Sequence, residues 1–371
     1  MLGALTIQRL LMKMAEVDAS DLHIKTGVPP VLRVAGELHR IDAPELTADE
    51  TRQLLAPVIP AALRDDLRTL GGIDFSHQEG IVERFRCSIF SAGDGLHAAI
   101  RRVKPKIPDF SDLHLPPVFS HIADTVHEGL CVVCGVTGSG KSSTLAAMLQ
   151  HINTTRPANI ITIEDPVEYL FQPDRAIVSQ REVGIDVPSF PQALRAAVRQ
   201  DPDVLMIGEM RDRETMFAGI QAAETGHLVY ATLHTADTMQ SFARILEFFE
   251  RGEHDFVRSA LAAGLKAVMA QRLVPCVRPG IQRVPATEVL INTPTVAELI
   301  RDERDEDLHA AMASNAADGM HDFTSSLARL VAEEWVDVKM AERFAPNREG
   351  LRSRVRGIEV KADTLVSRVR G

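Results

Sequence analysis

The chain has 371 residues, four cysteines and a formal net charge of −10. Typical domains contain about 100 to 200 residues, so this length allows two domains with separate cores. The acidic balance argues against nucleic acid as a partner, because duplex-binding proteins usually carry a basic surface. No run of about 18 apolar residues occurs, and four cysteines are too few for a disulfide framework, so we expect a cytoplasmic protein.

The first part of the chain reads as a small domain of its own. It contains one helical pattern followed by short segments of alternating polarity, such as 31–34 and 85–90, set between turn residues. We therefore predict an α+β domain over residues 1–105. Two prolines and four basic residues fall between Arg101 and Pro108, a composition typical of an exposed connector, and residues 106–115 are predicted to be a linker.

From residue 116 to about 235, helical patterns alternate with short apolar runs, which predicts parallel βα units. Each of four runs is followed at once by polar residues; the runs cover 130–133, 160–163, 204–207 and 228–233. Ligands bind beyond the carboxyl ends of strands in open parallel sheets. If these strands are neighbours, the polar residues that follow them are expected to meet at one phosphate site.

Beyond residue 255 the pattern is mostly helical, and the predicted second domain covers residues 116–345. Residues 346–371 are predicted to form a basic tail. Its cations are Arg348, Arg352, Arg354, Arg356, Lys361, Arg368 and Arg370. A solvated or frayed tail is expected, with a docking tail for an acidic partner as the alternative.

The first of the four apolar runs leads into a segment that fits the phosphate-binding loop pattern G-x-x-x-x-G-K-[ST] at every defined position. Its glycines let backbone amides point at phosphates, Lys141 can reach the β- and γ-phosphates, and the Ser142 hydroxyl can hold Mg²⁺. A nucleoside triphosphate site is therefore predicted. Its binding residues are Gly135, Val136, Thr137, Gly138, Ser139, Gly140, Lys141, Ser142 and Ser143.

Cys131 and Cys134 in the same run have the C-x-x-C spacing of some zinc and redox sites. In an extended strand, however, positions i and i+3 point to opposite faces, and no second pair of cysteines or histidines stands nearby in sequence. Buried structural cysteines are predicted here, with a metal or redox site as the alternative.

Three carboxylates follow the second run within five positions: Glu164, Asp165 and Glu168. Pro166 restricts the local backbone, so these acids are expected on a loop of defined geometry. One of them is predicted to orient the attacking water as a base, the alternative being acids on a solvated turn.

Gly208 and Glu209 follow the third run directly, the arrangement of a Walker B acid that holds Mg²⁺ directly or through water. A surface glutamate after a strand is the alternative.

His227 and His234 flank the fourth run, and we expect them to sense phosphate unless they are structural. Several arginines lie around the third run, and one or two are expected to contact phosphate; they are Arg195, Arg199, Arg211 and Arg213.

Taken in order, these segments resemble the Walker A motif, Asp box, Walker B motif and His box of the type II/IV secretion ATPases. The segments are 135–142, 161–169, 201–212 and 223–235. Within that superfamily the chain looks most like the PilT-type pilus retraction motors, and segment 19–30 is similar to their N-terminal signature. The resemblance implies a PAS-like N-terminal domain and then a RecA-like P-loop ATPase domain with C-terminal helices. It also implies a homo-hexamer with ATP and Mg²⁺ between subunits.

The resemblance further implies roles by position. Glu168 corresponds to the catalytic glutamate and Glu209 to the Walker B acid, which would hold Mg²⁺ with Ser142. His227 and His234 correspond to the His box. By the same mapping, Glu164 is a supporting residue and not the catalytic one. Asp165, Arg195, Arg199 and Arg211 are further candidates for supporting roles, from their positions near the predicted strands. In this family, arginines of the N-terminal domain reach the nucleotide of a neighbouring subunit, and the candidates here are Arg84, Arg86, Arg101 and Arg102.

The implied function is ATP hydrolysis that powers type IV pilus retraction and twitching motility. The implied partners are an inner-membrane platform protein, reached by peripheral docking at its cytoplasmic face, and a second pilus motor. Residues 295–300 depart from the Ala-Ile-Arg-Asn-Leu-Ile motif of retraction motors, since only Leu299 and Ile300 match. A PilU-like accessory ATPase, an extension or secretion ATPase, and a nucleotide-binding scaffold without turnover therefore stay open as alternatives.

Overall fold

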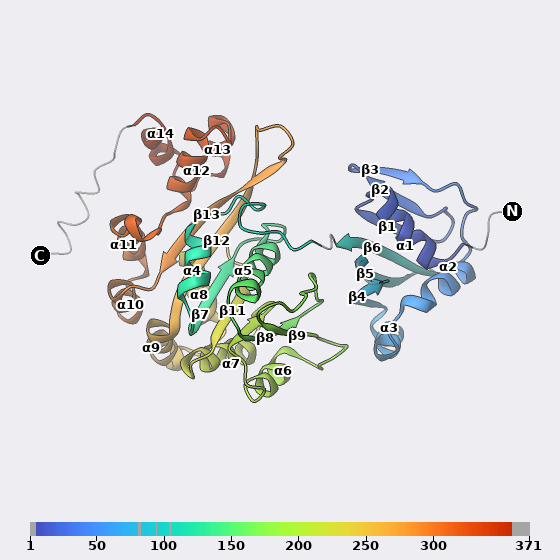
Figure 1. Cartoon of the computed structure of the whole chain (residues 1–371), viewed down its shortest axis with the longest axis horizontal. Coiled ribbons are helices and arrows are strands. Elements are labelled where there is room, and N and C mark those ends of the chain that lie inside the picture. Colours follow the sequence, from blue (N-terminus) through green and yellow to red (C-terminus); the bar gives the residue numbers. More distant parts are fainter. Residues whose placement is uncertain (1–4, 81–82, 94, 104–105, 358–371) are drawn as a thin grey trace, which may run out of the picture. The chain divides into compact units, whose positions relative to one another are not determined.

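The computed structural model describes residues 5–80, 83–93, 95–103 and 106–357 (Figure 1). The chain forms two compact units. The first comprises Met1–Ile107, Ile163–Gln172 and Gln180–Ala193; the second comprises Pro108–Thr162, Pro173–Ser179 and Leu194–Gly371. Two segments predicted to lie in the ATPase domain thus group with the N-terminal residues, because Val167 and Glu182 hydrogen-bond to Ser76 and Arg84. The domain limits at 1–105 and 116–345 stay predictions.

The first unit is built on a six-stranded sheet of order β3-β2-β1-β6-β5-β4, in which every neighbouring pair is antiparallel. Its strands are β1 (Asp21–Ile24), β2 (Val31–Val34), β3 (Glu37–Arg40), β4 (Gly72–Glu79), β5 (Glu83–Ala92) and β6 (Gly95–Val103). Its α-helices are α1 (Ile7–Glu16), α2 (Ala48–Leu55) and α3 (Arg64–Leu70), and short 3₁₀ turns cover Ala56–Val58 and Ala61–Leu63. The long β4–β5 hairpin carries residues that reach the candidate site.

Helix α1 shows why this sequence packs on the sheet. Its buried residues Ile7, Leu10, Leu11 and Met14 recur at helical spacing and so form one apolar face. The Thr6 side chain caps the helix by accepting a hydrogen bond from the Arg9 amide at 3.4 Å. The apolar face joins one core with the inward residues of the sheet, which include Leu22, Ile24, Phe75, Phe85, Ile89 and Ile100.

Most of a seven-stranded sheet of order β13-β12-β7-β11-β10-β8-β9 belongs to the second unit, while residues 163–164 of β8 and 180–182 of β9 group with the first. The strands are β7 (Gly129–Cys134), β8 (Asn159–Glu164), β9 (Ile177–Glu182), β10 (Val204–Ile207), β11 (Leu228–Leu233), β12 (Leu265–Pro275) and β13 (Arg283–Ile291). The β7, β10 and β11 strands run parallel to one another, and every residue in them is buried. The carboxyl ends of these three strands therefore share one edge of the sheet.

The helices that follow the first sheet are α4 (Val118–Thr125), α5 (Lys141–Thr155), α6 (Phe190–Ala197), α7 (Arg213–Glu224), α8 (Thr238–Glu247), α9 (His254–Gly264), α10 (Pro294–Arg301), α11 (Leu308–Ser314), α12 (Phe323–Ala332), α13 (Val338–Phe344) and α14 (Arg348–Val355). All belong to the second unit except residues 190–193 of α6, which group with the first. Short 3₁₀ turns cover Arg251–Glu253, Asp305–Asp307 and Ala316–Asp318. Helices α5 and α7 pack on β7, whereas α12 packs on β13 and α13 on β12 (Figure 1). The carboxyl-terminal helices thus cover the edge hairpin, and α5 starts at the edge where the parallel strands end.

Part of the predicted basic tail is ordered in helix α14. Asn347 caps this helix through the Gly350 amide at 2.8 Å, and Leu351 is fully buried against the neighbouring helices. Arg352 pairs with Glu342 of α13 at 2.7 Å. The structure differs from the predicted frayed tail here because one buried leucine anchors an arginine-rich turn; Lys361, Arg368 and Arg370 lie outside the described residues.

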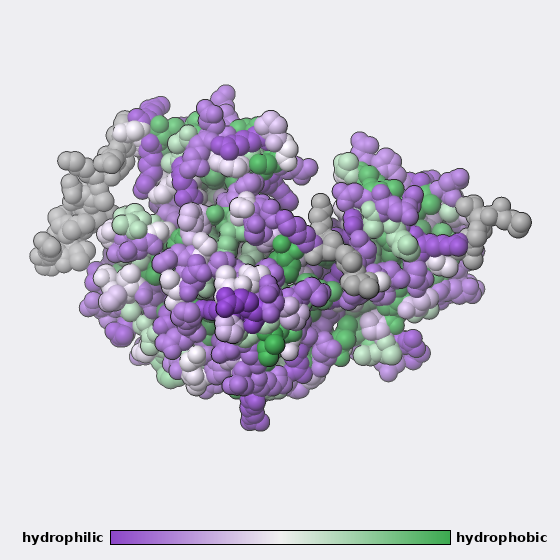
Figure 2. Space-filling view, in the orientation of Figure 1, coloured by the Kyte–Doolittle hydropathy of each residue, from purple (hydrophilic) through white to green (hydrophobic). Residues whose placement is uncertain are grey.

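The visible surface of the second unit is mainly hydrophilic, with hydrophobic residues in small separate patches (Figure 2). Scattered exposed apolar side chains of this kind are normal on protein surfaces. Among the described residues, no helix has both the length and the apolar character needed to cross a bilayer.

Candidate nucleotide-binding and active site

The phosphate-binding loop connects the end of β7 to the start of α5. Gly138 and Gly140 have φ angles of 77° and 93°, a left-handed conformation that glycine adopts easily. A Cβ atom at Gly135 would lie 2.7 Å from the carbonyl oxygen of Gln271, so only glycine fits there without a shift of β12. The glycines therefore serve both the curl of the loop and its close approach to the sheet.

Two polar side chains in this loop fit a bound phosphate. The Lys141 ammonium is buried and donates to the carbonyl oxygens of Gly135 at 2.8 Å and Val136 at 3.3 Å, so it lies across the loop. The buried Ser139 hydroxyl has no hydrogen-bond partner within the described residues. Helix α5 also begins without a side-chain cap. A helix N-terminus, a cation and an unused hydroxyl together form a site suited to an anion.

Gln271 of β12 holds this loop in place, and sequence reasoning missed it. Its Nε2 atom donates to the Ser139 carbonyl oxygen at 2.7 Å, and its Oε1 atom accepts from the Thr144 hydroxyl of α5 at 2.8 Å. The side chain is 2% exposed. Gln271 is not singled out by the sequence of β12, which also contains Lys266 and Arg272; it differs from them in being almost fully buried, and buried polar groups need partners.

Glu209 lies just past β10, at the edge where β7 and β11 also end. Its Oε1 atom lies 3.2 Å from Nε2 of His234, and its Oε2 atom lies 2.7 Å from Nη2 of Arg211. The Thr232 hydroxyl donates to the Gly208 carbonyl oxygen at 2.5 Å, which joins the ends of β10 and β11. The structure thus brings Glu209, His234 and Arg211 together on the edge of the sheet that carries the phosphate-binding loop.

His227 lies at the opposite end of β11. Its Nδ1 atom is 3.0 Å from the Ala222 carbonyl oxygen, and its own carbonyl oxygen accepts from the Gly129 amide, where β7 begins. At about 3.3 Å per residue, the length of β11 separates His227 from His234 by about 20 Å. Within one chain, the structure does not bring His227 together with Glu209.

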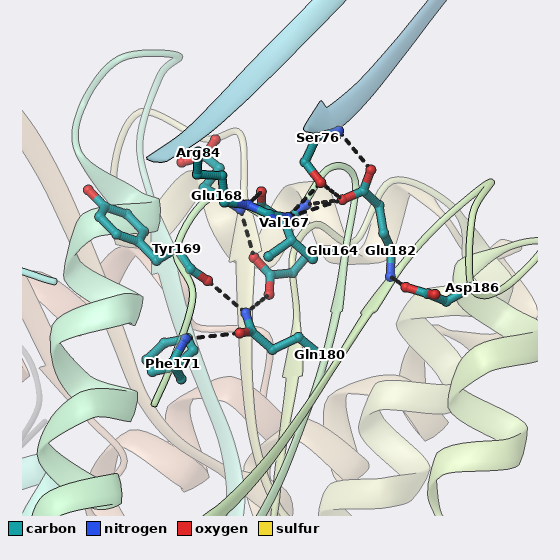
Figure 3. Close-up of polar contacts among 10 residues, drawn as sticks. All are labelled: Ser76, Arg84, Glu164, Val167, Glu168, Tyr169, Phe171, Gln180, Glu182 and Asp186. Carbon is teal, nitrogen blue, oxygen red and sulfur yellow. Dashed lines mark hydrogen bonds and ion pairs between the residues drawn. The ribbon is translucent and has the colours of Figure 1, made fainter. Parts of the chain in front are cut away.

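The three acids of the predicted Asp box belong to the first unit: Glu164 ends strand β8, whereas Asp165 and Glu168 lie on the loop that follows it. Figure 3 shows the contacts of Glu164 and Glu168. Glu164 is buried, and its carboxylate accepts from the Glu168 amide at 3.4 Å and from Gln180 Nε2 at 3.1 Å. Gln180 also donates to the Tyr169 carbonyl oxygen at 2.7 Å and accepts from the Phe171 amide at 3.0 Å. Glu164 and Gln180 therefore fix the loop that presents the half-exposed Glu168.

Asp165 differs from its neighbours because its side chain is exposed. Arg195 is also exposed and pairs with Glu214 of α7 at 3.3 Å, while Arg199 lies exposed after α6. Arg213 pairs with Glu253. Of the arginines that flank the third apolar run, Arg211 is the one placed on the candidate catalytic acid.

The four arginines proposed to act on a neighbouring subunit all have carboxylate partners within their own chain. Arg84 pairs with Glu182 at 3.5 Å, Arg86 with Glu168 at 3.4 Å, Arg101 with Asp21 at 2.8 Å, and Arg102 with Glu83 at 2.7 Å. Burial lowers the pKa of Arg84, an effect that the nearby carboxylates of Glu182 and Glu164 oppose. Arg84 is thus a buried structural cation here, and Arg86 is joined directly to the candidate catalytic glutamate.

The comparison with protein families gives one decisive match. The model of the type II/IV secretion system protein family matches residues 4–322, most of the chain. The chain belongs to this family. The predicted resemblance to the type II/IV secretion ATPases is confirmed.

Several known proteins are similar to this chain over most of its length. The type IV pilus retractation ATPase PilT of Pseudomonas aeruginosa is 39% identical over 91% of this chain and 98% of its own. The type IV pilus ATPase PilU of the same organism is 38% identical over 98% of this chain and 95% of its own. A crystal structure of the pilus retraction motor PilT with bound ADP superposes with a TM-score of 0.86 at 37% identity, covering 94% of this chain and 99% of that one.

These matches confirm the predicted α/β class with an N-terminal domain and an ATPase domain. Together with the phosphate-binding loop, they identify this family member as an ATPase that binds adenine nucleotide.

Proposed function

We propose that this ATPase is the motor that powers retraction of type IV pili. The observation that carries the proposal is the match to a retraction ATPase over 98% of that protein's length, a span that includes every motif of the candidate site. Relatives in type II secretion are matched over a smaller part of their length, for example 26% and 57%. Extension and secretion roles are therefore less favoured.

The chemistry follows from the side chains present. Lys141 and the N-terminus of α5 neutralise the phosphates, and Ser142 with Glu209 would hold Mg²⁺. When bound, that ion would screen the negative charge of the phosphate oxygens. Glu168 orients a water molecule toward the γ-phosphorus and accepts its proton as ADP departs. His234, 3.2 Å from Glu209, would respond to the loss of the γ-phosphate.

An accessory role beside a second motor is the alternative that a specific observation favours. PilU matches almost as well as PilT, and residues 295–300 of α10 lack four of the six residues of the retraction-motor motif. This departure lies on a carboxyl-terminal helix and not in the candidate active site. It leaves the side chains of the candidate active site unchanged.

Assembly into a homo-hexamer is also part of the proposal, with nucleotide bound between subunits and docking on an inner-membrane platform protein at the cytoplasmic face. In the ring, Arg101 is the better candidate to act across the boundary, because its side chain is 70% exposed whereas those of Arg84 and Arg102 are 10% and 13% exposed. Light scattering of the purified protein with ATP and Mg²⁺ is expected to give a mass near six subunits. A fully active monomer would contradict this.

The proposed function is tested by deletion of the gene in its native host, followed by counts of surface pili and assays of surface motility. Retraction predicts excess pili without movement, restored by the wild type and not by Glu168→Gln. Loss of pili would instead support extension. Normal motility that fails only when pili are under load would support the accessory role.

A further inference from the structure

Glu182 is a buried carboxylate at the end of β9, and it lies between the β4–β5 hairpin and the loop that carries Glu168 (Figure 3). Its Oε1 atom accepts from the Ser76 amide at 2.9 Å. Its Oε2 atom accepts from the Ser76 hydroxyl, from Arg84 Nη2 at 3.5 Å and from the Val167 amide at 3.1 Å. Four donors thus converge on one carboxylate that is 4% exposed.

Val167 is held on both of its backbone polar groups. Its amide donates to Glu182, and its carbonyl oxygen accepts from Arg84 Nε at 3.2 Å. The next amide along the chain, that of Glu168, donates to Glu164 at 3.4 Å. The backbone immediately before the proposed catalytic glutamate is therefore fixed by a buried ion pair, one partner of which comes from β5 of the N-terminal sheet.

We propose that Glu182 and Arg84 are positioning residues for Glu168, acting together as a clamp on Val167 that makes the β4–β5 hairpin part of the catalytic apparatus. The inference rests on the proposed role of Glu168. Moving a catalytic group by about 1 Å costs about 100-fold in rate, so a clamp on the adjacent peptide has a large effect on turnover. Such a clamp also links any movement of the hairpin to the position of Glu168.

Glu182→Gln tests the clamp with almost no change of shape. All four partners of the carboxylate are donors, so whichever way the amide turns, its NH₂ group faces another donor. The substitution also leaves the Arg84 cation buried without its counter-ion. Ser76→Ala is the milder second variant, since it removes the hydroxyl that bridges Arg84 and Glu182 and leaves the ion pair in place.

The experiment measures ATP turnover with Mg²⁺ in the full-length protein. For Glu182→Gln, kcat is expected to fall about 10-fold or more while the KM for ATP stays within about twofold of the wild type, and Ser76→Ala is expected to show a smaller fall of the same kind. Asp74→Asn, which alters an exposed carboxylate on the same strand as Ser76, is the matched control and is expected to keep wild-type kcat.

Hydrogen–deuterium exchange gives a readout that does not depend on turnover. Loss of the clamp is expected to raise exchange in residues 164–171 and to leave residues 141–155 of α5 unchanged. An equal rise in both segments would show general destabilisation and would overturn the proposal, as would wild-type kcat in both variants.

A double mutant separates this inference from the proposed function. If Glu182 acts through Glu168, adding Glu182→Gln to Glu168→Gln lowers the residual rate by less than about twofold, because the two effects are not additive. Wild-type turnover in Glu168→Gln alone would overturn the proposed role of Glu168. A loss in Glu168→Gln combined with full activity in Glu182→Gln and Ser76→Ala would overturn only the clamp.

Discussion

The Nε2 atom of His234 lies 3.2 Å from Oε1 of Glu209, at the edge of the sheet where the phosphate-binding loop begins. Arg211 contacts the other oxygen of the same carboxylate at 2.7 Å. Glu209 is thus held from two sides at the ends of two parallel strands. A carboxylate fixed in this way needs little rearrangement to bind a metal ion, directly or through a water molecule.

Replacing Glu209 by Gln is expected to lower kcat for ATP about 100-fold or more, because the amide keeps the shape of the side chain and loses its charge. Steady-state ATPase assays with Mg²⁺ measure the effect. Glu224→Gln, an exposed acid at the end of α7, is the control and is expected to behave as wild type. Retention of half or more of the activity in the Glu209 variant would exclude a Walker B role.

Gln271→Leu is expected to weaken nucleotide binding about 10-fold and to lower the thermal midpoint. The substitution leaves the Ser139 carbonyl oxygen and the Thr144 hydroxyl without their buried partner, at a cost of about 1 to 3 kcal/mol each. Titration with a fluorescent ATP analogue and thermal unfolding measure the two effects. Gln282→Leu changes an exposed glutamine before β13 and serves as control. Equal nucleotide affinities in the Gln271 and Gln282 variants would exclude a role of Gln271 in holding the phosphate-binding loop.

The sequence predicted those residues of the candidate site that directly follow a strand in the chain. The loop at 135–142 and the acid and histidine at 209 and 234 each follow a buried strand directly, so one motif or one apolar run was enough to place them. Gln271 and Glu182 could not be found in this way, because each contacts partners more than 100 residues away. Helix α14 was missed because its many arginines conceal the single buried Leu351.

Three of the four thiols are expected to be unreactive in the native protein. Burial raises the pKa of Cys87 and Cys131 to about 12 and that of Cys134 to about 11, so almost no thiolate forms near neutral pH. Cys276 is only half-buried. Titration with a disulfide reagent at pH 8 should therefore modify Cys276 alone in the folded protein and all four thiols after unfolding. Rapid reaction at Cys131 or Cys134 would revive the alternative of a redox or metal site.

Half-buried His321 is expected to make stability depend on pH. Burial lowers its pKa, an effect that the Gly319 carbonyl oxygen opposes, and its Nε2 atom lies 2.8 Å from the Thr287 hydroxyl. The unfolded chain therefore binds the proton more readily. This contribution to stability is complete above the unfolded pKa of about 6.5 and is lost as pH falls toward the lower folded pKa, by at most about 1.4 kcal/mol per pH unit.

Thermal unfolding of the wild type and of His321→Asn between pH 7.5 and 5 checks this prediction, with exposed His309→Asn as the control. The midpoint should fall less steeply with acid in His321→Asn than in the other two proteins. Parallel curves for all three would assign the pH dependence to other groups.

The most direct test of the whole account is steady-state ATP hydrolysis by the purified chain, compared with Lys141→Ala. Lys141 is the cation that lies across the phosphate-binding loop, and Lys339→Ala is a control at an exposed lysine of α13. We predict turnover by the wild type and by Lys339→Ala that requires Mg²⁺, and a loss of about 100-fold or more in Lys141→Ala. Equal rates in wild type and Lys141→Ala, or none in either, would contradict an ATP-hydrolysing motor.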